Sequence, residues 1–206
     1  MSIAPSSAGV TDGRRIRSRV SSTGSTTGWD AALMDLCFRG FGRLREGFSA
    51  MPKIDIDSAP TGHGTGYPEE FAGPCKPRRR WRLGDAVGLD QFGVNLLRLP
   101  DGAWSSQRHW HAGEDEFVWV LSGEVVLVED EGETVLRAGD CAGFKAGVAN
   151  GHRIENRSGA EAVLLEVGTR TPGGDSGDCP DIDMVFRPGG YFHRDGTPYP
   201  KHDRRT

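Results

Sequence analysis

Two histidines separated by one residue, His109 and His111, are the residues of this chain whose types and spacing most clearly suggest chemistry. On a β-strand successive side chains point to opposite faces, so residues i and i+2 point the same way. Glu116 follows within a few residues, where a second strand can bring its carboxylate to the same point in space. Imidazole nitrogens and a carboxylate oxygen are ligands that first-row transition metals accept. His152, in a later strand-and-turn segment, completes a predicted set of four metal ligands.

The elements that must position these residues are short strands joined by turns. Pro100-Asp101-Gly102 is typical of a turn, and Asp130-Glu131-Gly132 predicts a hairpin between two apolar runs. The predicted strands cover residues 94–99, 116–121, 123–129, 133–137, 141–144, 152–156 and 162–168. No helical period competes in this region. The pattern therefore predicts an all-β fold, either a small antiparallel barrel or a double-sheet jelly roll.

Composition excludes several classes of function. No apolar run approaches the ~18–20 residues that a membrane-spanning helix needs, so we expect no membrane partner. The formal net charge of -4 gives no basic surface for nucleic acid. The four cysteines form no CxxC pair, which argues against a structural zinc site. With no secretory signal peptide, we expect reduced thiols and a cytoplasmic location.

The chain divides by composition into a barrel and less regular flanks. The first segment is rich in Ser, Gly, Thr and Arg, and we expect it to be disordered or mis-started, with Met51 as the genuine start. A marginal helix over 29–48, or a cationic targeting segment there, are the alternatives. The predicted organisation is an extension over 1–50, an irregular N-terminal arm over 51–91, a barrel over 92–170 and a C-terminal arm over 171–206.

The residues of the predicted barrel resemble the two motifs of the cupin superfamily. The first motif runs glycine, five residues, His-x-His, three or four residues, glutamate, six residues, glycine. This chain has Gly102, six residues, His109-x-His111, four residues, Glu116, six residues and Gly123. The first spacing is therefore one residue longer than in the motif.

The second motif runs glycine, five residues, Pro-x-Gly, two residues, histidine, three residues, asparagine. This chain has Gly139, five residues, Lys145-Ala146-Gly147, four residues, His152, three residues and Asn156. Lys145 replaces the proline, which puts the rigidity of that turn in doubt, and two residues are added before the histidine. These differences change loops rather than predicted ligands, and the resemblance covers residues 92–168.

The resemblance implies a cupin-type jelly-roll barrel with a mononuclear three-His/one-Glu metal site, and a homodimer. The ligand set suits Fe, Mn, Ni, Co or Zn and does not choose among them. The chain also resembles bacterial single-domain cupins of ill-defined function, some labelled sugar-phosphate isomerase-like or auxin-binding-like. We therefore expect a metal-binding cupin that acts on or binds a small polar molecule. Isomerase, dioxygenase and lyase chemistry are not ranked, and the alternative is a non-catalytic binding or regulatory module with a structural or absent metal.

Other polar residues are weaker candidates for the site. The run Arg78-Arg79-Arg80 is interpreted as a solvated edge, with a phosphate site as the alternative. Glu114 and Asp115 are expected in solvent, although either could orient a ligand histidine. Residues that could face the barrel mouth or cover the pocket are Gln107, Arg98, Asn150, Lys145, Tyr191 and His193. Trp110 and Trp119 are expected to pack in the core or a dimer interface.

Overall fold

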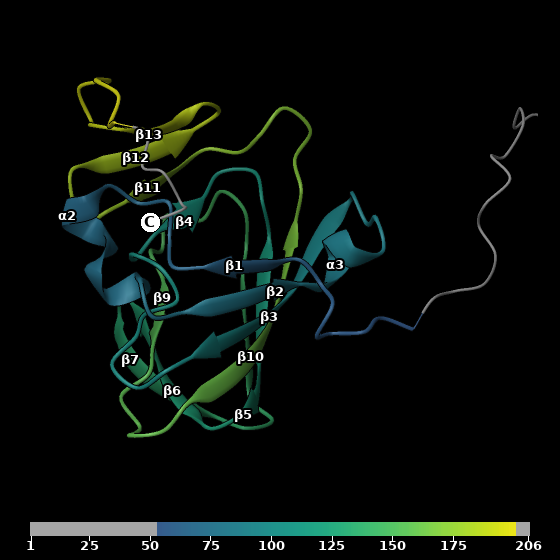
Figure 1. The fold of residues 1–206 in the computed structure, drawn as a ribbon. Coiled ribbons are helices and arrows are strands. Elements are labelled where there is room, and N and C mark those ends of the chain that lie inside the picture. Colours follow the sequence, from purple (N-terminus) through teal and green to yellow (C-terminus); the bar gives the residue numbers. More distant parts are fainter. Residues whose placement is uncertain (1–52, 201–206) are drawn as a thin grey trace, which may run out of the picture. The chain divides into compact units, whose positions relative to one another are not determined.

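The computed structural model describes residues 53–200 (Figure 1). The predicted extension over 1–50, its marginal helix and the proposed start at Met51 lie outside the described residues. The helical elements are α2 (Glu69–Ala72), η1 (Gly73–Cys75) and α3 (Leu83–Ala86). The strands are β1 (Thr61–His63), β2 (Arg79–Arg82), β3 (Phe92–Leu99), β4 (Trp110–His111), β5 (Glu116–Ser122), β6 (Glu124–Glu129), β7 (Gly132–Arg137), β8 (Cys141–Phe144), β9 (Arg153–Glu155), β10 (Ala162–Thr169), β11 (Gly177–Cys179), β12 (Met184–Arg187) and β13 (Gly190–Phe192). None of these helices has the length and apolar character that a membrane crossing requires.

Three antiparallel sheets make up the described part of the chain (Figure 1). The largest has the strand order β1-β2-β3-β10-β5-β8, the second β13-β12-β11-β4 and the third β7-β6-β9. Strands 3, 5, 6, 7, 8, 9 and 10 fall on the seven predicted strands, and Glu129 pairs with Gly132 across the predicted hairpin. The prediction of an all-β fold is confirmed.

The core lies on the inner face of the large sheet and of the β6–β9 pair. Leu97, Val120, Val125 and Leu164 are fully buried there, each a residue that alternates with outward-facing neighbours. Burial of each such side chain stabilises the fold by about 1.5–3 kcal/mol. Because Val120 points inward on β5, alternation also points Glu116 inward. The packing of the barrel thus fixes the direction of the first candidate carboxylate.

The two arms contain more regular structure than their glycine and proline content predicts. β1 and β2 extend the large sheet beyond β3, and β11, β12 and β13 form a sheet with β4. The arms also share a second core, in which Tyr67 and Cys75 pack with Cys179 and Met184. Strands of three or four residues carry almost no period-two signal, so pairing with a neighbouring strand decides their conformation.

Gly123, the last residue of the first motif, occupies the turn between β5 and β6. Its φ of 84° lies in the left-handed region, which other residues rarely adopt. A Cβ atom at this position would lie 2.9 Å from the Cα atom of Ala162. Both the backbone conformation and the close approach of β10 therefore require glycine here.

Candidate metal centre

Main-chain pairing brings the two motifs together. His109 and His152 form an antiparallel bridge in which each backbone N–H donates to the other's carbonyl, at 3.0 and 2.9 Å. His111 ends β4, and Glu116 begins β5. The histidine of the second motif is thereby fixed beside the His-x-His pair, although they are far apart in sequence.

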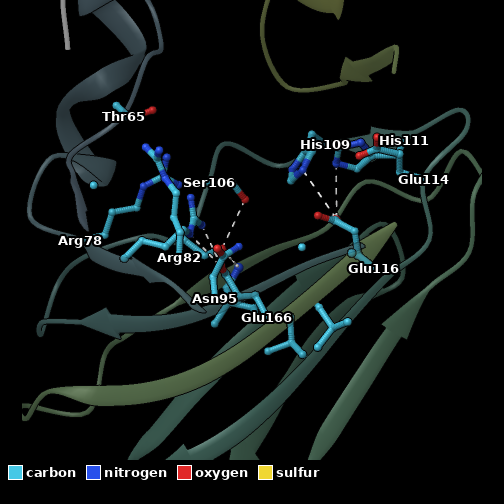
Figure 2. A pocket seen from close by; sticks show the side chains of 18 of the residues that line it. Thr65, Arg78, Arg82, Asn95, Ser106, His109, His111, Glu114, Glu116 and Glu166 are labelled. Atoms are coloured by element: carbon cyan, nitrogen blue, oxygen red, sulfur yellow. Dashed lines mark hydrogen bonds and ion pairs between the residues drawn. The ribbon is translucent and has the colours of Figure 1, made fainter. Parts of the chain in front are cut away.

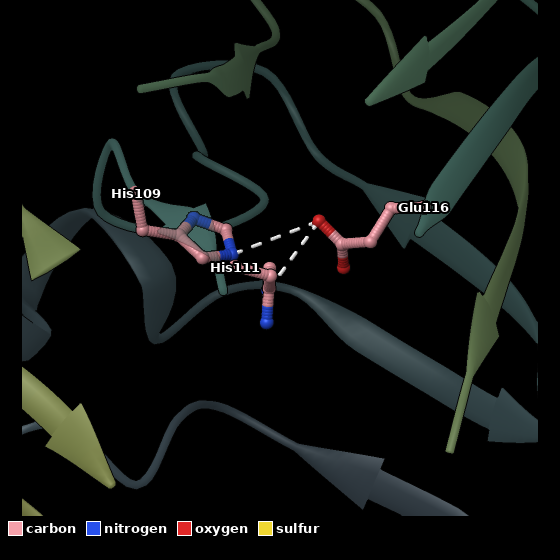
Figure 3. Close-up of side chains that lie close together, drawn as sticks. All are labelled: His109, His111 and Glu116. Atoms are coloured by element: carbon pink, nitrogen blue, oxygen red, sulfur yellow. Dashed lines mark ion pairs between the residues drawn. The ribbon is translucent and has the colours of Figure 1, made fainter. Parts of the chain in front are cut away.

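All three histidine side chains approach one oxygen of Glu116. The Oε2 atom lies 2.9 Å from His152 Nε2, 3.5 Å from His111 Nε2 and 3.9 Å from His109 Nε2. Figure 3 shows His109 and His111 directed at this carboxylate. The potential ligand atoms of His109, His111 and Glu116 all lie within 4.8 Å of one another. His152 is not part of this group of three, although its Nε2 is the nearest of the three nitrogens to Oε2 and is hydrogen bonded to it.

Hydrogen bonds on the far side of two rings determine which nitrogen faces the centre with a lone pair. His109 Nδ1 lies 2.9 Å from the carbonyl oxygen of Gln107, and His111 Nδ1 lies 2.7 Å from Asp175 Oδ2. A carbonyl and an ionised carboxylate only accept, so both Nδ1 atoms carry the proton. In the neutral form of these rings the Nε2 atoms present lone pairs toward Glu116, and His111 Nε2 is buried without a hydrogen-bond partner. Lone pairs that face a carboxylate repel it unless a cation lies between them, so these residues fit a divalent metal ion.

Electrostatics favours the protonation states that ligation needs. Burial lowers the pKa of His109 to about 4, which keeps the imidazole neutral near pH 7. Burial by itself would raise the pKa of Glu116, but the hydrogen bond from His152 and the neighbouring His111 and His109 outweigh it and lower this pKa. The centre therefore holds a neutral His109 imidazole beside an ionised Glu116 carboxylate.

His152 differs from the other two histidines. Its ring stacks on Phe144 with centroids 3.6 Å apart and planes 4° apart. Its Nδ1 atom is buried without a hydrogen-bond partner. Metal ligation through Nε2 would move the ring proton to that nitrogen, so His152 lacks the orienting acceptor that His109 and His111 have.

The centre opens into a cavity of about 740 Å³. Its wall combines barrel residues such as Asn95, Ser106 and Glu166 with residues of the N-terminal arm (Figure 2). Arg78 is only 8% exposed, and Arg80 is half-buried and paired with Glu166. The expectation of a solvated edge is wrong for these two arginines. It is right for Arg79, which is exposed on the other face of β2.

Most of the weaker candidates lie away from this cavity. Gln107 is buried, and its amide donates to the carbonyl of Phe71 at 2.7 Å. Arg98 is exposed on the outer face of the sheet. Asn150 and Lys145 line a second cavity of about 210 Å³, which His111, Glu116 and His152 also border.

The predictions for the two tryptophans and for the two C-terminal residues Tyr191 and His193 have different outcomes. Trp119 is 45% exposed, so core packing is excluded for it and the interface alternative stays a prediction; Trp110 is partly buried on β4. Tyr191 lines the large cavity and packs on the ring of Tyr67 at 5.2 Å. His193 instead bonds Asp183 and stacks on Tyr199, as a structural cap would.

The acid that hydrogen bonds the candidate ligand His111 is Asp175, which the sequence did not indicate. Asp175 accepts from His111, whereas Glu114 accepts from the N–H of Thr171 and Asp115 from the N–H of Ala146. The last bond holds the turn in which lysine replaces proline. Asp175 lies in a glycine-rich loop far along the chain, and no local spacing connects it to the histidines.

The fold is an all-β barrel with a polar, histidine-rich cavity, and both features are those expected of a cupin. Residues 95–168 match the family model described as a cupin domain. A crystal structure of a sugar phosphate isomerase of the cupin superfamily from Silicibacter pomeroyi is 46% identical, with a TM-score of 0.68, over 72% of this chain and 97% of that chain. A candidate sugar phosphate isomerase from Acidithiobacillus ferrooxidans is 33% identical, with a TM-score of 0.51, over 55% and 73% of the two chains. No curated protein matches the chain. This chain belongs to the cupin superfamily.

Proposed function

We propose that this cupin binds one divalent transition metal through His109, His111, Glu116 and His152, and uses the centre to bind and activate a small polar molecule. The observation that carries the proposal is the approach of three imidazole Nε2 atoms to one oxygen of Glu116, while the Nδ1 atoms of His109 and His111 are bonded to acceptors on the far side. Fe, Mn, Ni, Co and Zn all suit this ligand set. When bound, such a metal would act as a Lewis acid on a carbonyl or hydroxyl oxygen.

The chain's own residues then have separate roles. Asp175 and the carbonyl of Gln107 hold the rings of His111 and His109 in the ligating tautomer. Glu116 supplies a negative charge that offsets part of the charge of the metal. These groups are ligands or orient ligands, so none of them is free to act as a general acid or base.

Isomerisation of a sugar phosphate is the reaction suggested by the names of the two similar proteins. A polarised carbonyl or hydroxyl is what an isomerase of this kind needs, so the candidate centre is compatible with it. Dioxygenase and lyase chemistry use similar ligand sets. The second candidate function is a binding module in which the metal anchors a ligand without turnover.

Elemental analysis of the purified full-length chain tests the metal centre. We expect about one equivalent of a transition metal per chain after reconstitution, and loss of most of it in His111→Gln. His193→Gln is the matched control, because His193 bonds Asp183 outside the centre and its loss should leave metal content unchanged. A metal content far below one per chain in the wild-type protein contradicts the proposal.

Turnover separates the enzyme from the binding module. Metal-dependent conversion of a sugar phosphate, lost in His111→Gln and retained in His193→Gln, supports the isomerase. Thermal stabilisation by the same compound without conversion supports the binding module.

A further inference from the structure

Three arginines, Arg78, Arg80 and Arg82, face the cavity that holds the candidate metal centre. β2 pairs with β3 so that Arg80 lies opposite Leu97, which is fully buried in the core. Alternate residues of β2 therefore point inward, and Arg79 points to the outer face. Although this arginine-rich segment looks like a basic surface patch in the sequence, three of its guanidinium groups line the cavity.

Two of these charges lack a carboxylate partner. Glu166 neutralises Arg80 through two bonds of 2.6 and 2.8 Å. Arg78 donates to the carbonyl of Gly64 at 2.9 Å and lies over the Tyr67 ring at 6.0 Å, so its charge has no carboxylate partner. Within residues 53–200, no ion pair of 4.0 Å or less involves Arg78 or Arg82. Arginine stays protonated in proteins, so both charges persist.

Burial makes these charges costly. Arg78 is 8% exposed, and burial together with the nearby Arg80 lowers the pKa of its guanidinium group. A buried cation without a counterion is unfavourable, and an anion that enters the cavity would relieve this cost. The cavity thus has positive charge at a place where a ligand can reach it.

We propose that Arg78 and Arg82 form a subsite for the phosphate group of a small phosphorylated molecule whose other end reaches the metal centre. Figure 2 shows both arginines across the cavity from His109 and Glu116. The phosphate subsite does not depend on the proposed metal site; only the position of the ligand's other end rests on it.

Charge and shape favour phosphate over carboxylate. A phosphate monoester carries about -1.5 to -2 charges at pH 7, which matches two unpaired guanidinium groups. The planar fork of arginine suits the oxygens of phosphate. The hydroxyl of Ser106 is buried in the same wall, and its sole partner in the described part of the chain is the Ser105 hydroxyl, 3.3 Å away. Glycine at position 62 leaves space, because a Cβ atom there would lie 3.3 Å from Arg82 Nη2.

Calorimetric titration of the full-length protein with inorganic phosphate tests the subsite. We expect binding to both metal-loaded and metal-stripped protein, weakened about tenfold or more in Arg82→Gln and in Arg78→Gln. Arg82 is only half-buried, so Arg82→Gln keeps the test valid if Arg78→Gln does not fold. Arg79→Gln removes the same charge from the outer face of the same strand and should bind phosphate like the wild type.

Each outcome separates the subsite from the metal site. Equal weakening in Arg79→Gln and Arg82→Gln means that general positive potential binds phosphate, which overturns the subsite. Phosphate binding that requires metal and ignores Arg78 and Arg82 places the anion on the metal and overturns it as well. Arginine-dependent binding in a protein that takes up no metal supports the subsite while the proposed metal function fails. Acetate binding as tight as phosphate at equal ionic strength overturns the choice of phosphate.

Discussion

Replacement of Asp175 by asparagine should weaken metal binding without removing any proposed ligand. Asp175 Oδ2 accepts from His111 Nδ1 at 2.7 Å, and Oδ1 accepts from the N–H of Gly113 at 2.8 Å. The side chain is only 9% exposed, so water cannot easily replace either bond. An asparagine has one acceptor oxygen, and its NH₂ group would therefore face one of these two donors.

The expected loss follows from these contacts. One charge-assisted hydrogen bond disappears and one buried donor loses its acceptor, which costs about 1–3 kcal/mol. Mutation of such orienting carboxylates typically lowers metal affinity about 10–100-fold, which is about 1.4–2.7 kcal/mol. The two ranges agree, so we expect Asp175→Asn to bind metal 10–100-fold more weakly than the wild type, by about that energy.

Competition against a chromophoric chelator measures this affinity directly. Asp115→Asn is the matched control, because Asp115 is 58% exposed in the neighbouring loop and accepts from the N–H of Ala146 rather than from a ligand. Its affinity should stay close to that of the wild type. An Asp175→Asn affinity within about twofold of the wild type, in a protein whose His111→Gln variant loses its metal, would refute the reasoning that the carboxylate fixes the His111 tautomer.

Three further predictions concern stability and assembly. Gly123→Ala should lower the free energy of unfolding by about 1–3 kcal/mol in urea titrations, because of its positive φ and the contact with Ala162; an unchanged midpoint contradicts this. Burial raises the pKa of Cys179 to about 12 from 9.0, so the folded state keeps a proton that the unfolded state loses above pH 9. Stability should therefore fall as pH rises from 9 toward 12, and Cys179→Ala should flatten that slope of the unfolding free energy; an equal slope in both proteins refutes the assignment. Phe117 and Trp119 project from the same outer face of β5, so Trp119→Lys should convert the predicted homodimer to a monomer in sedimentation experiments; a variant that stays dimeric removes this face from the interface.

The barrel strands could be predicted because their pattern is local. Alternating apolar residues and turn residues set the limits of β3, β5, β6 and β10, and each structural strand lies within about two residues of its predicted range. The His-x-His pair and Glu116 could be predicted to meet for the same reason, since strand alternation fixes side-chain direction.

The rest depends on contacts between distant segments. Asp175 reaches His111 because β11 pairs with β4, and no sequence periodicity near residue 175 predicts that pairing. The arginine run could not be divided into inward and outward residues until β2 was known to pair with β3. Local propensity is weak for strands of three or four residues, so tertiary pairing determined what the sequence left open.

One part of the cavity wall lies inside the residues that match the cupin domain, and the other part lies outside them. The candidate ligands lie within residues 95–168, which match the cupin domain, whereas Arg78, Arg82 and Asp175 lie outside that range. A match over the barrel therefore bears on whether a metal can be held and carries no information on which molecule is recognised. The four candidate ligands belong to the barrel, and the two arginines belong to the N-terminal arm that joins its sheet. It follows that substitutions at Arg78 and Arg82 should weaken phosphate binding without changing metal content, and substitutions at His111 should lower metal content without changing the binding of inorganic phosphate.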